Sequence, residues 1–144
     1  MNLGALRADC VGMKWEPESG AGVRVLLVDD DAYHREALRE VLESLEFSVV
    51  GEAADGAEAI EQAQQTNPHV VLMDLRMPVL GGIESTQAIR QRQPSVQVII
   101  LTAFDDFGLR VAAEEVGAYC YLPKGSSAEL ISHSILKARD YTVA

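Results

Sequence analysis

Cysteine and basic residues are both scarce in this sequence. Its two cysteines, Cys10 and Cys120, lie far apart and form no Cys-x-x-Cys or Cys/His pattern. This argues against a disulfide scaffold and a zinc site, and it is typical of a reduced, cytoplasmic protein. The chain has 12 basic and 22 acidic residues, a formal net charge of −10. Because phosphate contacts need clustered Lys and Arg, we do not expect this chain to bind nucleic acid by itself.

Long apolar runs are absent as well. The run VQVIILTA at 96–103 is interrupted by Gln97 and Thr102, so no segment is predicted to span a membrane. The first 22 residues hold no apolar core of signal-peptide length, so secretion is not indicated. The 144 residues, 48% of them apolar, suffice for one globular domain.

From Val23 onward, short apolar runs alternate with longer amphipathic segments. The residues before it, 1–22, contain four Gly and no sustained periodicity, and we interpret them as a flexible extension. The pattern predicts strands at 24–30, 47–53, 70–75, 96–103 and 118–123, and helices at 32–46, 55–65, 81–93, 105–117 and 126–141. Several strands are apolar throughout, as expected when helices cover both faces of a parallel sheet. The predicted fold class is therefore α/β, an open doubly wound sheet.

Capping residues mark several of the predicted helix ends. Asp31 is placed to cap the first helix, and either Asp105 or Asp106 the fourth. Gly117 is a stop signal for the fourth helix. Ser126, three residues before Glu129, matches a capping box that would open the last helix.

Polar side chains lie at the carboxyl ends of four of the five predicted strands. The first strand ends in Asp29, Asp30 and Asp31, the third in Asp74, the fourth in Thr102 and the fifth in Lys124. In open parallel sheets, sites form at the carboxyl ends of the strands, so these side chains are expected to converge. Two carboxylates ~4 Å apart repel by about 4 kcal/mol at an effective dielectric constant near 20, so such a cluster favours a cation.

The ligands offered by this cluster are all oxygen atoms, which favours a hard cation: Mg²⁺, Mn²⁺ or Ca²⁺. A magnesium ion together with Lys124 and Thr102 suits the binding of phosphoryl oxygens. One carboxylate would then remain to act as a nucleophile. Other polar residues have ordinary explanations: His34, His69 and His133 are interpreted as surface or structural, and Cys120 as a small core residue.

With these residues in place, the stretch 23–141 resembles a response-regulator receiver domain of two-component signalling. The motifs VLLVDD, VLMDLRMPVLGG, ILTA and YLPKG occur in the family's order. The intervals from Asp30 to Asp74, Thr102 and Lys124 are successively 44, 28 and 22 residues, all normal for the family. DDDAYHREAL, LTAFDD and YLPKG are similar to the NarL-type, or LuxR-type, subfamily.

This resemblance implies a role for each residue of the cluster. Asp74 would be the phosphorylated aspartate and also a ligand of Mg²⁺ or Mn²⁺, with Asp30 binding the ion directly and Asp29 binding it through water. The backbone carbonyl of Arg76 would complete the protein ligands. Lys124 would contact the phosphoryl group.

Two further residues would form the switch. Thr102 would move its hydroxyl onto the phosphoryl group, and the aromatic ring of Tyr121 would turn inward in response. The alternative for Tyr121 is an ordinary strand aromatic. Arg76 and Phe104 lie two residues after Asp74 and Thr102, and we hypothesise that their bulk slows autodephosphorylation.

The resemblance also implies a fold, partners and a missing output. The fold would be flavodoxin-like, with five parallel strands in the order 2-1-3-4-5 and five helices. The partner would be a sensor histidine kinase, with homodimerisation on phosphorylation and no membrane contact. Members of this subfamily append a helix-turn-helix output domain, for which the stub at 142–144 leaves no room. Such a domain would catalyse only its own phosphotransfer and dephosphorylation.

Three alternatives compete with a kinase-driven transcriptional switch. The domain could act alone through protein contacts, or work independently of phosphorylation. It could also be an aspartate-nucleophile phosphohydrolase, because Asp29 and Asp31 spell the required Asp-x-Asp. Those enzymes need a cap for substrate specificity, and no insertion here is long enough to form one.

Overall fold

The computed structural model describes residues 18–104 and 106–141. Within these ranges five strands alternate with five helices. The strands are β2 (Arg24–Val28), β3 (Ser48–Ala53), β4 (Val70–Met73), β5 (Gln97–Thr102) and β6 (Cys120–Pro123). The helices are α1 (Ala32–Ser44), α2 (Gly56–Thr66), α3 (Gly82–Arg92), α4 (Phe107–Glu115) and α5 (Ala128–Asp140). Most of the expected extension at 1–22, the stub at 142–144, and Cys10 and Asp105 lie outside the described residues.

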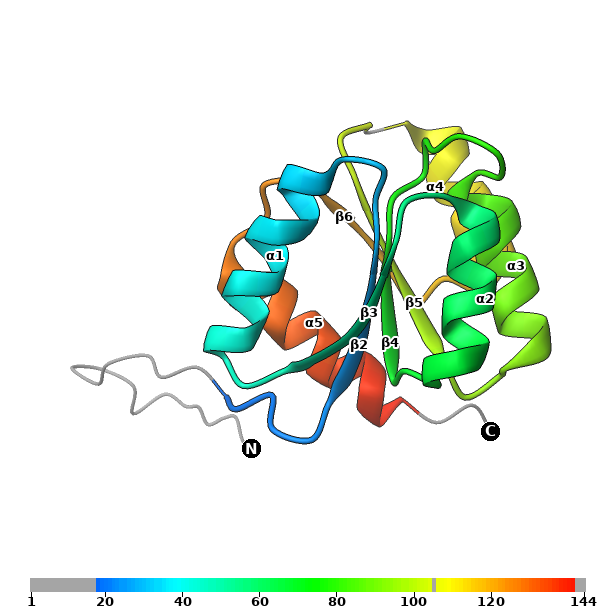
Figure 1. Ribbon diagram of the computed structural model, residues 1–144. Coiled ribbons are helices and arrows are strands. Elements are labelled where there is room, and N and C mark those ends of the chain that lie inside the picture. Colours follow the sequence, from blue (N-terminus) through cyan, green and yellow to red (C-terminus); the bar gives the residue numbers. More distant parts are fainter. Residues whose placement is uncertain (1–17, 105, 142–144) are drawn as a thin grey trace.

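The strands form one parallel sheet in the order β3-β2-β4-β5-β6. Counted along the chain this is 2-1-3-4-5, so the predicted α/β doubly wound fold is confirmed. Helices α1 and α5 cover one face of the sheet and α2, α3 and α4 the other (Figure 1). The order reverses between β2 and β4, and Asp29 and Asp74 directly follow these strands.

Each face of the sheet has its own apolar core. Leu27, Leu72 and Ile99 pack with Leu42 of α1 and Ile135 of α5. On the other face, strand residues pack against the apolar sides of α2, α3 and α4 through Ala59, Ala63, Ile89 and Ala113. β4 and β5 are buried along their whole length, which explains why their sequences are apolar except for Gln97 and Thr102 at the two ends of β5. This rigid sheet fixes the strand ends at which the polar residues lie.

The helix ends agree with the predicted caps at three places and differ at one. The Asp31 carboxylate accepts the N–H groups of Tyr33 and His34, and Asp106 caps α4. Gly117 has the positive φ of a helix stop, 94°. The capping box at Ser126 is wrong: Ser127 caps α5.

Ser126 has a different role from the one predicted. Its hydroxyl donates to the carbonyl oxygen of Pro123 at 2.6 Å and closes the turn after β6. The Ser127 hydroxyl accepts the N–H of Leu130 instead. Either of two adjacent serines can serve as an N-cap, and the sequence pattern alone does not distinguish them. The geometry of the turn determines which serine caps the helix.

The segment that leads into β2 is bound to the domain. Gly20 donates its N–H to the carbonyl of Leu45 at 2.8 Å, and Ser19 donates its hydroxyl to Glu46. Val23 is fully buried. The ordered domain contacts thus begin a few residues before the boundary expected at Val23. No helix in the described part of the chain is both long and apolar enough to cross a membrane.

Candidate functional site

Three carboxylates meet at the carboxyl end of the sheet. Asp29 and Asp30 follow β2 and Asp74 follows β4, and one ligand oxygen from each lies within 4.8 Å of the other two. Asp29 and Asp74 are almost completely buried, at 3% and 5% exposure, while Asp30 faces solvent. Buried carboxylates need compensation by hydrogen bonds or positive charge.

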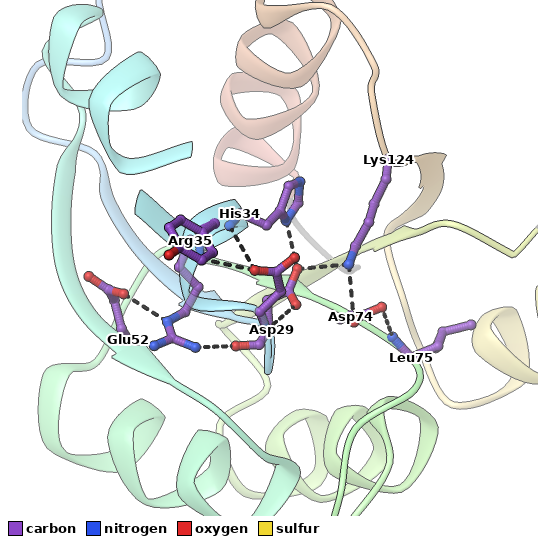
Figure 2. A network of polar contacts seen from close by, with 9 residues as sticks. Asp29, His34, Arg35, Glu52, Asp74, Leu75 and Lys124 are labelled. Atoms are coloured by element: carbon purple, nitrogen blue, oxygen red, sulfur yellow. Dashed lines mark hydrogen bonds and ion pairs between the residues drawn. The ribbon is translucent and has the colours of Figure 1, made fainter. Parts of the chain in front are cut away.

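Lys124 supplies positive charge to this cluster from the end of β6. Its Nζ lies 2.9 Å from Oδ2 of Asp29 and 3.3 Å from Oδ2 of Asp74, so it bridges the two acids (Figure 2). Burial alone would lower the pKa of Lys124, but the hydrogen bond that it donates to Asp29 and the charges of both acids raise that pKa above its ordinary value. Lys124 is therefore an ammonium ion at neutral pH.

The two buried acids have pKa values shifted in opposite directions. Burial raises the pKa of Asp29, but hydrogen bonds from the Asp31 N–H, Lys124 and His34 outweigh it and hold that pKa below its usual value. Burial also raises the pKa of Asp74, and here Lys124 compensates only in part because the charge of Asp29 opposes it. Asp74 is thus the more basic carboxylate of the pair.

The donor set fits a divalent cation. Three carboxylates carry −3 and Lys124 carries +1, which leaves −2 in a largely buried space. All the acidic ligand atoms are oxygen, the type preferred by Mg²⁺ and Mn²⁺. Asp29, Asp30 and Asp74 are the residues that could hold such an ion.

The predicted switch residues lie on the neighbouring strands β5 and β6. Thr102 is buried at the end of β5, and its hydroxyl oxygen accepts the N–H of Phe104 at 3.2 Å. The Tyr121 hydroxyl, from β6, donates to the carbonyl of the same Phe104. Both residues are therefore connected through one loop residue.

Phe104 also contacts the residue that lies two positions after Asp74. The Arg76 guanidinium carbon lies 3.9 Å from the Phe104 ring centroid, a cation–π arrangement between two loops beside the acidic cluster. Both side chains are exposed. The carbonyl group of Arg76 remains a predicted ligand.

His34 belongs to the site, although the sequence suggested only a surface or structural role. Its Nδ1 lies 2.6 Å from Oδ2 of Asp29. The other two histidines lie elsewhere: Nδ1 of His69 accepts the N–H of Arg24, which is a structural role, and His133 is exposed on α5. The Cys120 thiol is partly buried against the core, where burial raises its pKa.

Arg35 is a second contact that sequence reasoning missed. It donates to the backbone carbonyl of Asp29 and pairs with Glu52 of β3 at 2.8 Å (Figure 2). Glu52 also binds Arg39 at 2.8 Å. The one sequence feature that pointed to this contact is Glu52 near the end of β3, but the sequence does not show that Glu52 lies beside α1.

Comparison with known proteins places these features in one family. The family model "Response regulator receiver domain" matches residues 25–136, most of the chain. The chain belongs to the response regulator receiver domain family. This confirms the resemblance seen in the motifs.

Named relatives include both multidomain regulators and smaller proteins. The transcriptional regulatory protein LnrK of Bacillus subtilis is 40% identical over 115 residues, which cover 79% of this chain and 52% of LnrK. The chemotaxis protein CheY of Thermotoga maritima is 33% identical over 72% of this chain and 86% of CheY. The chain thus spans about half the length of LnrK but most of the length of CheY.

A solved structure also connects the chain with the LuxR-type subfamily. The two-component response regulator of the LuxR family from Aurantimonas sp. SI85-9A1 is 36% identical, with a TM-score of 0.76. The alignment covers 81% of this chain and 84% of that one. The subfamily resemblance seen in the sequence is therefore supported by structure.

Proposed function

We propose that this receiver domain is a phosphorylation-activated switch in which Asp74 accepts a phosphoryl group from a partner histidine kinase in the presence of Mg²⁺. The observation that carries the proposal is the convergence of Asp29, Asp30, Asp74 and Lys124 at one strand edge, with a net charge of −2. Receiver domains as a family interact with histidine kinases and phosphotransfer partners.

Asp74 is the acceptor because its carboxylate is the more basic of the two buried acids. An oxygen of Asp74 attacks phosphorus, a new P–O bond forms, and the P–N bond to the donor histidine breaks. The imidazole leaves with that electron pair. When bound, Mg²⁺ would neutralise charge on the transferring phosphoryl oxygens.

Lys124 is placed to follow the phosphoryl group. Its ammonium already bridges Asp29 and Asp74 in the unphosphorylated domain. Once Asp74 is phosphorylated its side chain is an acyl phosphate, whose phosphoryl oxygens are stronger hydrogen-bond acceptors than the carboxylate oxygens they replace. We infer that the ammonium then pairs with a phosphoryl oxygen.

The switch would be transmitted through Phe104. Thr102 can donate its hydroxyl hydrogen to a phosphoryl oxygen, and a movement of Thr102 would disturb the hydrogen bond it accepts from Phe104. The carbonyl of Phe104 holds the Tyr121 hydroxyl, so that bond would change as well. The charge added at Asp74 would thus change the conformation of the surface formed by β5, α4 and β6, and this change would alter dimerisation or output.

The output would be transcription regulation, as the relation to the transcriptional regulatory protein LnrK suggests, through the helix-turn-helix domain that the subfamily resemblance implies. The second candidate is a receiver that acts alone through protein contacts. The observation that favours it is the match to CheY of Thermotoga maritima, of which this chain covers 86%. Size-exclusion chromatography distinguishes a dimer formed on phosphorylation from a monomer that remains one.

Intact-mass spectrometry tests the central proposal. We expect incubation with acetyl phosphate and Mg²⁺ to add one phosphoryl mass, and Asp74→Asn to abolish the addition. Asp140→Asn, at an exposed acid at the end of α5, is the matched control and should label normally. Labelling of Asp74→Asn to the wild-type level, or no labelling of a wild-type protein that binds Mg²⁺, would contradict the proposal.

A further inference from the structure

His34 is the one imidazole among the described residues that contacts the acidic cluster. It lies in the first turn of α1, with its side chain 24% exposed, and its Nδ1 is 2.6 Å from Oδ2 of Asp29. An ionised carboxylate only accepts hydrogen bonds, so Nδ1 is the donor. Figure 2 shows the imidazole and the Lys124 ammonium approaching the same Asp29 carboxylate.

The hydrogen bonds to Asp29 leave few open directions around its carboxylate. Oδ1 accepts the N–H of Asp31 at 2.9 Å. Oδ2 accepts from His34 at 2.6 Å and from Lys124 at 2.9 Å. Since each carboxylate oxygen has about two acceptor directions, a cation or a cation-bound water that uses Oδ2 must displace one of these two donors.

Lys124 is the donor that can leave. Its flexible stem lets the ammonium move, and Asp74 at 3.3 Å offers a second partner. His34 is held more firmly, because it is in a helix that Asp31 caps through the N–H of His34 itself. The next residue, Arg35, fixes the backbone carbonyl of Asp29 and pairs with Glu52.

We propose that His34 is a positioning residue for the divalent cation. His34 holds the Asp29 carboxylate toward the cluster, while Lys124 moves off Asp29 when the cation binds. The inference rests on the metal site of the proposed function. Residues that orient a ligand from behind commonly change metal affinity by about 10- to 100-fold when removed. Because Asp31 and Arg35 still hold Asp29, we expect the lower end of that range for His34.

Mn²⁺ binding to the full 144-residue chain tests this role without phosphorylation. The probe is Mn²⁺ alone, and the free ion is measured by its EPR signal. His34→Leu replaces the imidazole donor with an apolar side chain that has a high helix propensity. His34→Asn keeps an N–H donor near the position of Nδ1. His133→Leu, at an exposed histidine of α5, is the control.

The expected result is a dissociation constant for Mn²⁺ raised about tenfold in His34→Leu, largely restored in His34→Asn and unchanged in His133→Leu. If His34→Leu fails to fold, His34→Ala is compared with His34→Asn, and the same loss and rescue are expected. Equal or tighter Mn²⁺ binding without the donor would overturn the role of His34. A wild-type chain that binds no Mn²⁺ would overturn the metal site itself, and the role with it.

Discussion

Gly82, the first residue of α3, packs against the backbone of the loop that begins at Asp74, and replacing it with alanine tests whether that loop has room to move. A Cβ added to Gly82 would lie 2.2 Å from the carbonyl oxygen of Asp74 and 2.8 Å from Cα of Leu75. Both neighbours are backbone atoms, so no side chain can rotate away. Gly82 also donates its N–H to the Leu75 carbonyl at 2.9 Å, which ties the start of α3 to the same loop.

The cost of Gly82→Ala is that of overpacking in a closely packed region, about 1 to 3 kcal/mol of unfolding free energy. For a domain of this size each kcal/mol lowers the melting temperature by about 4 °C. The loop must shift to relieve the contact, and it carries Asp74 with it. We therefore expect both a lower urea midpoint, followed by far-ultraviolet circular dichroism, and slower labelling of Asp74 by acetyl phosphate.

Gly108→Ala is the matched control. Gly108 is exposed near the start of α4, and an added Cβ would meet only the Oδ1 atom of the Asp106 side chain, at 3.1 Å. Alanine is favoured over glycine in a helix by about 0.5 to 1 kcal/mol, so we expect this control to be at least as stable as the wild type. If Gly82→Ala keeps the wild-type urea midpoint and the wild-type labelling rate, the close packing of Gly82 does not constrain the loop and the reasoning is refuted.

Two further predictions concern a histidine and the two side chains beside the site. Burial lowers the pKa of His69 below 6.5, with Arg24 and Arg139 adding to the effect, so the folded state gains stability above pH 6.5 and loses it as the pH falls toward the folded pKa. The urea midpoint should therefore drop more between pH 7.5 and 5.5 in the wild type than in His69→Asn, and equal drops would contradict this. The Arg76–Phe104 contact is worth about 0.5 to 1 kcal/mol, so the double variant Arg76→Ala with Phe104→Ala should lose its phosphoryl group about 2- to 5-fold faster. A radiolabel decay assay with Mg²⁺ measures this, and an unchanged rate would show that the pair does not hinder water.

The alternation of apolar and amphipathic runs was sufficient to predict the sheet and its helices. The apolar runs of β4 and β5 form strands that are buried on both faces of the sheet. The amphipathic segments form the helices that cover these faces. The wrong predictions concern helix ends. α5 begins after Ser127, because the hydroxyl of Ser126 donates to the carbonyl oxygen of Pro123 in the preceding turn. The first helix also ends at Ser44, before the predicted Glu46, whose φ of 74° is incompatible with a helix.

The convergence of the acids and Lys124 could be predicted because strand ends of a parallel sheet share one edge. His34 and Arg35 could not, because both lie inside a helix, where a polar residue is ordinarily solvated. Their contacts depend on how far α1 is rotated about its axis relative to β2. That rotation is set by the burial of Leu42 against the sheet, and it turns His34 toward Asp29.

The structure also gives the two buried acids different surroundings. Asp29 and Asp74 both end a buried strand and both contact Lys124. Asp29 has the additional Asp31 N–H and the His34 imidazole, whereas Asp74 has the Leu75 N–H and the repulsion of Asp29. The charge on Asp74 is therefore the less stabilised of the two. Of two adjacent carboxylates the more basic one is the better nucleophile. The contacts around Asp74 thus support the proposal that it is the acceptor.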